Sequence, residues 1–136
     1  MTDTSELEIA YFAGFFDGEG MVAIYRKKYV VALANTDVRP LKRAQELWGG
    51  YICSQAASSR PGALRDLWRW QIYGHSARGF LEAIRPYLIL KVEQVDVYLE
   101  TLARVPIKGG KYGPGDREAI QGAADQLRLL KQRGVA

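Results

Sequence analysis

The sequence is poor in the residues that build disulfides, zinc sites and catalytic triads, because it has one cysteine and one histidine among 136 residues. A single cysteine, Cys53, excludes an internal disulfide and a cluster of thiolate ligands. A zinc site or a Ser-His-Asp triad would depend on His75 alone. Gly74-His75-Ser76 lies between a predicted strand and a predicted helix, so a loop or capping role is the better interpretation of His75. Cys53 falls in a strand-like segment, where a lone cysteine is most often a small buried residue.

Long apolar runs are also missing. No stretch reaches the roughly 20 apolar residues that cross a bilayer. The segment Met1–Glu6 shows no basic stretch ahead of an apolar one, as a secretory signal would. We therefore expect no membrane partner, no secretion and an intracellular location, in the cytoplasm or nucleoid of a prokaryote or in an organelle matrix.

The chain is moderately basic, since 19 Lys and Arg residues against 15 Asp and Glu residues give a net charge of +4. This balance is compatible with nucleic-acid binding but does not establish it. The length and the ordinary globular composition fit one domain. We expect a single domain over residues 1–136, with a core at about 6–104 and a C-terminal loop and helix over 105–136.

Hydrophobic periodicity and turn residues predict an α+β chain with a four-stranded antiparallel sheet. Ser5 and Glu8 have the spacing of a capping box, which should open a helix that runs to about Asp17 and stops at Gly18 or Gly20. The other predicted elements are strands over 21–26, 29–35, 51–56 and 67–73, and helices that follow Asp37, Ser76 and Asp116 or span 91–104.

The first predicted helix requires packing on two sides. Its run Ala10–Phe16 is apolar all round, whereas a helix packed on one side needs only an apolar stripe. Gly14 and Gly18 lie on one face, and small residues at this spacing let two helix backbones approach closely. The pattern predicts packing against a second copy of the helix. The alternative is that Gly18 only ends the helix and Gly14 only makes room for a strand.

Two acids, Asp17 and Glu19, lie at the end of this helix, where carboxylates are unfavourable for the helix dipole. A divalent cation would offset that, because hard cations prefer carboxylate oxygens. If two such helices met at a two-fold axis, their acids would require metal or protonation, and the site would suit two-metal chemistry on a phosphodiester. The alternative is that both acids merely begin the next turn.

The segment Phe12–Gly20, with its Ala-Gly pair, its aspartate and its final glycine in register, resembles the LAGLIDADG motif of homing endonucleases. Glu19 stands where the motif has its second aspartate. Downstream segments resemble the same family at the expected places, and the resemblance covers about residues 6–104. These segments are Asn35-Thr36-Asp37, Leu47-Trp48-Gly49-Gly50, Trp70-Gln71-Ile72-Tyr73-Gly74, Phe80-Leu81, Pro86-Tyr87-Leu88 and Leu90-Lys91.

The resemblance implies the αββαββα homing-endonuclease fold, in which the sheets form a saddle over DNA and the motif helices form the dimer interface. One motif in a chain of this length implies a homodimer that cuts both strands of a long, nearly palindromic site and leaves 3′ overhangs, in intron or intein homing. Dimer symmetry agrees with such a site. The expected interface residues are Phe12, Ala13, Gly14, Asp17 and Gly18.

The resemblance also assigns roles in catalysis. Glu19 and the Gly18 carbonyl are the implied ligands of a divalent metal, with Mg²⁺ as the first expectation and Mn²⁺ as the second. Asp37 matches a polar position that orients water or metal near the scissile phosphate. Lys91 matches a basic residue that polarises water or stabilises the transition state. Taken without the resemblance, Asp37 is a helix cap and Lys91 is a solvated lysine.

Strand alternation separates a core face of the sheet from a face for DNA. In the strand over 67–73, Trp68, Trp70 and Ile72 should face the core. On the opposite face, arginine suits guanine, glutamine suits adenine, and basic loop residues suit phosphates. The candidate DNA contacts are Ala23, Tyr25, Lys27, Lys28, Gln55, Arg60, Arg65, Arg69 and Gln71, with Cys53 as a further candidate.

Two other functions fit the same fold. A maturase would bind intron RNA and assist splicing, and a regulator would bind DNA without cutting it. A regulator would be expected to lose the metal-binding acid, which Glu19 retains. A dimeric α+β protein without a nucleic-acid partner is the remaining alternative. The agreement between the motif and the downstream segments favours DNA cleavage.

Overall fold

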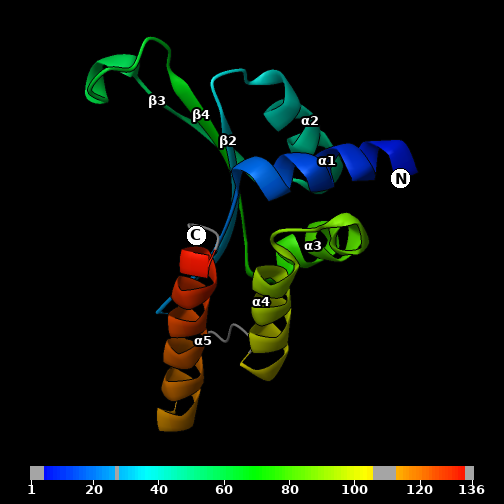
Figure 1. Cartoon of the computed structure of the whole chain (residues 1–136), viewed down its shortest axis with the longest axis vertical. Coiled ribbons are helices and arrows are strands. Elements are labelled where there is room, and N and C mark those ends of the chain that lie inside the picture. Colours follow the sequence, from blue (N-terminus) through cyan, green and yellow to red (C-terminus); the bar gives the residue numbers. More distant parts are fainter. Residues whose placement is uncertain (1–4, 27, 106–112, 134–136) are drawn as a thin grey trace.

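The chain forms an open antiparallel sheet with helices packed against it (Figure 1). This computed structural model describes residues 5–26, 28–105 and 113–133. None of the helices in these ranges has the length and apolar content to cross a membrane. The elements are α1 (Glu6–Glu19), β1 (Gly20–Tyr25), β2 (Lys28–Asn35), α2 (Arg39–Trp48), β3 (Tyr51–Gln55), β4 (Leu67–Tyr73), α3 (Arg78–Ile84), α4 (Val92–Arg104) and α5 (Pro114–Arg133).

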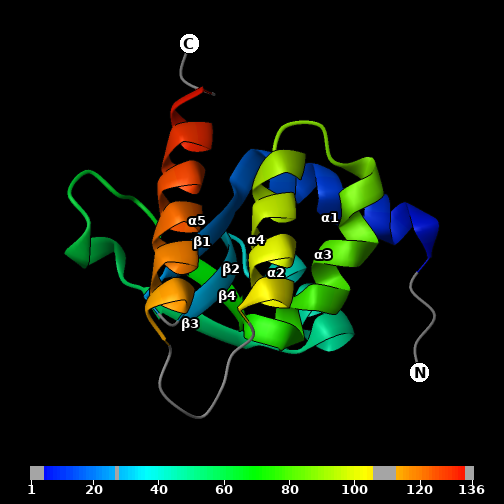
Figure 2. The same ribbon diagram turned by 90° about the horizontal axis from the view of Figure 1, so that it is seen from below.

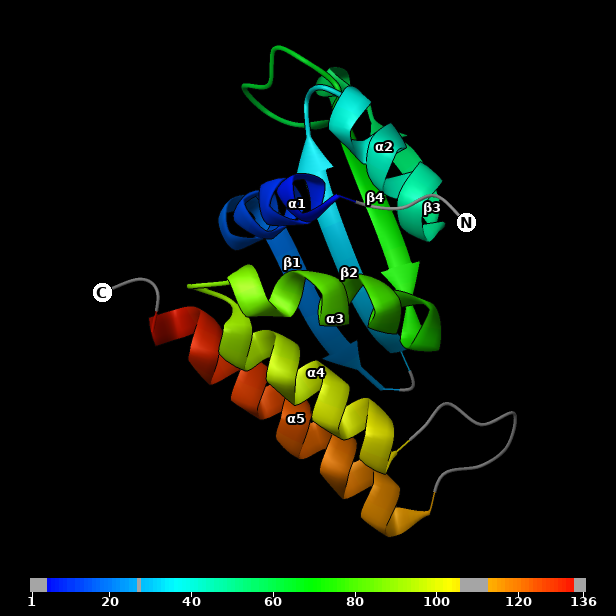
Figure 3. The same cartoon turned by 90° about the vertical axis from the view of Figure 1, so that its right-hand side faces the viewer.

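The sheet has the strand order β1-β2-β4-β3, and each neighbouring pair is antiparallel. Helices α1, α2 and α3 cover one face of the sheet (Figure 3). Helices α4 and α5 lie side by side, and α5 runs along the edge strand β1 (Figures 2 and 3). The structure therefore confirms the predicted αββαββα order, and α4 and α5 extend it.

The core lies between the sheet and these helices. Trp70 and Ile72 of β4 are at most 1% exposed, and Trp68 is partly buried against the same core, as strand alternation predicts. The Phe80 ring of α3 makes edge contacts with Trp70 at 5.0 Å and with Trp48 at 4.8 Å between ring centroids. Such aromatic clusters bury large areas and fix the helices on the sheet.

Two predicted helix starts are wrong. Ser76 does not cap α3, because Gly74–Ala77 forms a 3₁₀ turn and α3 begins at Arg78 without a side-chain cap. Asp116 does not precede α5, because the helix already begins at Pro114. Proline is favoured at the first helical position, where its missing amide would have no intrahelical partner. The predicted cap of α1 is confirmed, since the Glu8 amide donates to the Ser5 hydroxyl at 3.1 Å.

Gly20, which follows α1, is expected to tolerate no larger residue. A Cβ added there would meet the Phe16 carbonyl oxygen at 2.5 Å and the Phe16 ring at 2.6 Å, and Phe16 is fully buried. Gly20→Ala should therefore lower the free energy of unfolding by about 1–3 kcal/mol. Gly122→Ala on α5 is the matched control, because a Cβ there meets nothing within 4 Å. That change should stabilise the helix by roughly 0.8–1 kcal/mol. Denaturant unfolding measures both, and equal stability of the two variants would contradict the clash.

Candidate active site and nucleic-acid interface

The C-terminal end of α1 is open to solvent. The helix stops because Gly20 adopts an extended backbone (φ −76°, ψ 157°) and begins β1. Gly18 and Glu19 are exposed, and nothing lies within 4 Å of a Cβ placed on Gly18. Among the described residues, no hydrogen bond or ion pair uses the Glu19 carboxylate. Glu19 therefore presents an exposed carboxylate at the end of the helix.

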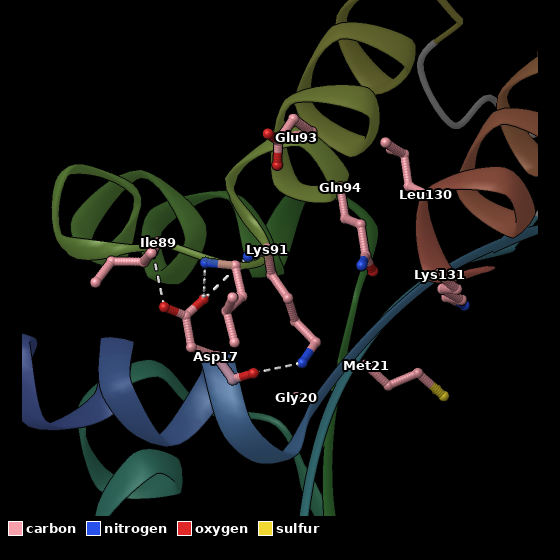
Figure 4. Close-up of a pocket in the computed structure, with 10 residues that line it drawn as sticks. Asp17, Gly20, Met21, Ile89, Lys91, Glu93, Gln94, Leu130 and Lys131 are labelled. Atoms are coloured by element: carbon pink, nitrogen blue, oxygen red, sulfur yellow. Dashed lines mark hydrogen bonds between the residues drawn. The ribbon is translucent and has the colours of Figure 1, made fainter. Parts of the chain in front are cut away.

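The neighbouring acid, Asp17, is bound within the chain. Its carboxylate accepts the backbone amides of Ile89 at 2.7 Å, Leu90 at 3.1 Å and Lys91 at 3.0 Å (Figure 4). The Lys91 ammonium donates to the Asp17 carbonyl oxygen at 2.7 Å. These donors offset the unfavourable helix dipole, so Asp17 needs no cation there. Its carboxylate ties α1 to the segment before α4.

Lys91 lies at the N-cap of α4 and is partly buried. Burial lowers the pKa of its ammonium group, and the negative charges of Asp17 and Glu19 oppose that shift. Lys91 is therefore not a fully solvated lysine. It places a cation close enough to Glu19 for their charges to interact.

A hollow of about 630 Å³ opens beside Lys91 (Figure 4). Among its lining residues, the sequence analysis assigned site roles to Asp17 and Lys91 and named Gly20 and Leu90 only as parts of the motif and of a family segment. It missed Gln94 of α4 and Lys131 of α5, which carry no part of the motif. The lining consists of Asp17, Gly20, Met21, Ile89, Leu90, Lys91, Glu93, Gln94, Leu130 and Lys131.

Asp37 lies elsewhere in the subunit. It borders a second hollow together with Tyr11 and Phe15, and this hollow shares no residue with the one beside Lys91. The Arg39 guanidinium bonds the Asp37 carboxylate at 2.6–3.1 Å and lowers its pKa to about 2. The same carboxylate accepts the Arg39 amide at 3.0 Å, but the N-cap of α2 is Val38, so Asp37 precedes the cap position that the sequence alone suggested for it. One chain therefore does not bring Asp37 together with Lys91, and Arg39 is a neighbour that the sequence analysis did not identify.

The open end of α1 offers oxygen ligands of the kind that a divalent cation prefers, but it offers too few of them to complete a site. The Glu19 carboxylate and the Gly18 carbonyl at the helix end offer oxygen atoms, which hard cations prefer. Among the described residues, no group of at least three His, Cys, Asp or Glu side chains could hold a metal. Magnesium takes about six oxygen ligands. A complete site would therefore require water, substrate or a second copy of the chain.

The sheet face opposite the helices carries rows of polar and aromatic residues. Arg69 pairs across the sheet with Ala34 and Cys53, so these residues share a row. Gln71 pairs with Tyr51, and its amide oxygen accepts the Tyr73 hydroxyl at 2.8 Å. The same face continues through the exposed Gln55, Tyr25 and Lys28. Alternation thus places Arg69, Gln71, Gln55, Tyr25 and Lys28 on one face, as predicted. Cys53 is exposed, so the expectation that it is buried is wrong.

One of the other candidate DNA contacts, Arg60, differs from the expectation, and another lies outside the described residues. The Arg60 guanidinium folds back to donate to the Arg65 carbonyl, and its Nε is buried without a partner among the described residues, so it does not project as a free cation. Arg65 lies before β4, not within it, and its charge acts on Asp37. Ala23 borders a hollow between β1 and α5. Lys27 is the residue outside the described ranges.

The exposed side of α1 also differs from the expectation. Phe12 and Ala13 are at most 1% exposed and pack into the core of their own subunit, so they cannot line a partner surface. Gly14 and Gly18 are exposed, and nothing lies within 4 Å of a Cβ on either. They continue a stripe, with helical spacing, that begins at the exposed Leu7 and Tyr11. The residues Leu7, Tyr11, Gly14 and Gly18 are called the α1 stripe below.

This architecture is shared with solved homing endonucleases. The chain superposes on two crystal structures of the homing endonuclease I-CvuI in complex with DNA, with TM-scores of 0.69 and 0.68 and 22% identity. Each match covers 92% of this chain and 82% of the other. One complex holds the I-CreI target, not cleaved, with 2 mM Mg, and the other holds the enzyme's own target with 2 mM Ca.

The archaeal intron-encoded homing endonuclease I-Vdi141I, in complex with DNA, also matches, with a TM-score of 0.56 and 15% identity over 91% of this chain and 98% of that one. The fold is therefore the homing-endonuclease fold. The sequence model of the LAGLIDADG-like domain matches residues 6–85, and the chain belongs to this family. No protein with a curated description matches it. The family match ends before Lys91, α4 and α5.

Proposed function

We propose that this chain is a subunit of a homodimeric, metal-dependent endonuclease that cuts both strands of a specific DNA site. The observation that carries the proposal is the exposed Glu19 carboxylate at the open end of α1, beside the partly buried Lys91. The exposed α1 stripe ends at the same place. Two copies that met through this stripe would bring two Glu19 carboxylates together, and like charges at close range favour metal binding.

Each residue of the site has a proposed role. Glu19 and the Gly18 carbonyl would hold the cation, with Mg²⁺ preferred and Mn²⁺ as an alternative. When bound, such a metal activates water and stabilises the oxygens of the displaced phosphodiester. The Lys91 ammonium stabilises the negative charge that develops on the phosphate. Asp37 orients water, for which its carboxylate would give up part of its hydrogen bonding to Arg39. Because Asp37 lies away from Lys91 in its own subunit, it would act together with the Lys91 of the other subunit.

The target follows from the sheet face and the symmetry. Arg69 and Gln71 lie adjacent to each other across the face and offer donors that suit guanine and adenine. Tyr25, Lys28 and Gln55 extend the same surface. A two-fold dimer reads two related half-sites, so the target would be long and nearly palindromic. Cleavage that leaves 3′ overhangs, in intron or intein homing, by a single domain over residues 1–136 completes the proposal. The endonucleases with similar structures were solved with DNA.

The deciding experiment is cleavage of a randomised duplex library by the purified protein, with Mg²⁺ and with EDTA. Recovery of one nearly palindromic family of cut sites, only with metal, is the expected result. Sequencing of the ends shows the overhang. Enriched binding without cutting would refute cleavage and leave a DNA-binding regulator. The absence of both would refute a DNA target, and intron RNA would be the next ligand to test.

A further inference from the structure

Lys131 of α5 shares the hollow beside Lys91 although it lies outside the family match. Lys91 lines the hollow from the start of α4, and Lys131 lines it from the last turns of α5 (Figure 4). Lys91 is partly buried, whereas Lys131 is exposed to solvent on the rim of the hollow. Partial burial of its side chain lowers the pKa of the Lys131 ammonium, and the charge of Lys91 lowers it further. Two cations that line one hollow create a positive potential there, which attracts an anion.

The negative charge of Asp17 acts on Lys91, but no acid of the hollow pairs with Lys131 among the described residues. The Asp17 carboxylate is occupied by three backbone amides. Glu93 also borders the hollow, but Figure 4 shows its carboxylate pointing away from Lys91 and Lys131. Among the described residues, no hydrogen bond or ion pair involves the Lys131 ammonium. Its charge is therefore available to a ligand.

Gln94 supplies a second polar group without a partner. It is 7% exposed, it borders the same hollow, and its Oε1 has no hydrogen-bond partner among the described residues. Buried polar atoms are nearly always bonded, so an orphan of this kind points to a missing water or ligand. The two ends of a glutamine amide can be exchanged by rotation, so Gln94 can also present its NH₂ group to an anion.

Lys131 also borders the hollow between α5 and β1, together with Ala23. It therefore stands between the end of α1 and the edge of the sheet face that carries Arg69 and Gln71. A nucleic-acid strand that crossed this edge toward Glu19 would pass the Lys131 ammonium. Lys131 is the one described residue that borders both hollows.

We propose that Lys131, with Lys91 and Gln94, forms a phosphate-binding subsite that holds the DNA backbone beside the end of α1. Lys131 is a positioning residue, and α5 completes the active site of the family domain. This inference rests on the proposed function, because the phosphate belongs to the DNA that the sheet face binds.

The test compares Lys131→Met, Lys131→Arg and, as a matched control, Lys42→Met on the exposed side of α2. The full-length protein is titrated with the duplex recovered from the library and with a duplex of unrelated sequence, over a range of salt concentrations. The slope of log K against log salt should fall by about 1 per subunit in Lys131→Met, by the same amount on both duplexes. Lys131→Arg should restore it, and Lys42→Met should match the wild type.

Three results would overturn the subsite. The first is an unchanged slope in Lys131→Met, and the second is a fall in slope on the selected duplex alone. The third is an equal fall in slope in Lys131→Arg, accompanied by a lower Tm. The last would mean that Lys131 acts through packing. Because slopes are also measured on the unrelated duplex, the test still decides if the wild type binds DNA without cutting it. A wild type that cuts, with an unchanged slope in Lys131→Met, would refute the subsite alone.

Discussion

Glu19→Gln is expected to abolish DNA cleavage while DNA binding and folding stay intact. The amide has nearly the shape of the carboxylate, and no contact among the described residues depends on the acid. Loss of the negative charge removes the anionic metal ligand that one chain offers at this position. A fall of at least about 10³-fold in the single-turnover rate corresponds to roughly 4 kcal/mol of lost transition-state stabilisation. The measurement is cleavage of the selected duplex under single-turnover conditions, beside a titration of binding with Ca²⁺.

Two variants bracket this result. Glu118→Gln on α5 changes an exposed glutamate in the same way and should cut at the wild-type rate. Glu19→Asp restores the residue that the motif carries and shortens the arm by one methylene, so it should retain part of the activity. If Glu19→Gln lowered binding or Tm as much as cleavage, Glu19 would be structural and the proposed metal site would be wrong.

The strands and their faces could be predicted from the sequence because both depend on short-range alternation. Trp70 and Ile72 alternate with Arg69 and Gln71, and the pleat of a strand sends such neighbours to opposite faces. A hairpin between 21–26 and 29–35 fixes its own register through its short turn. The sheet face was therefore predictable residue by residue, except where α5 borders Ala23.

The state of Asp17 could not be predicted because its partners are distant in sequence. The amides of residues 89–91 follow it by more than 70 positions. The helix-dipole argument correctly stated that Asp17 needed compensation, but a cation and a set of backbone amides satisfy that need equally well. The same limit explains why Lys131 was missed, since only the packing of α5 on β1 brings it to the hollow.

The apolar run of α1 predicted that the helix packs on two sides. It did not show which residues face the core of the subunit and which face outward. Phe12 and Ala13 are buried inside the subunit, and the exposed side begins with Leu7 and Tyr11. Spacings of three and four residues from Gly14 give this stripe, because they return to one face of a helix. The spacing of Gly14 and Gly18 therefore indicates the exposed side of α1 correctly. Phe12 and Ala13 were assigned to that side because they are apolar and close to Gly14 in sequence.

Gly14→Leu is expected to convert the proposed dimer into monomers that remain folded. A Cβ on Gly14 meets nothing within 4 Å in the subunit, so the leucine projects into solvent without a clash. Leucine also has the higher helix propensity, by about 0.8 kcal/mol. In a dimer built on the α1 stripe, the same side chain would hold the two helix backbones apart. A rise of at least about 100-fold in the dimer Kd corresponds to roughly 2.8 kcal/mol.

Sedimentation velocity over a range of protein concentrations measures this shift, and circular dichroism confirms that the subunit is folded. Gly122→Leu makes the same change at an exposed α5 position with equally open space, and it should leave the dimer intact. Cleavage should fall with dimerisation in Gly14→Leu, because the described residues of one chain offer too few ligands for the cation and keep Asp37 in a separate hollow. A Gly14→Leu protein that dimerised normally would move the interface away from α1, and two Glu19 carboxylates would then have no reason to meet.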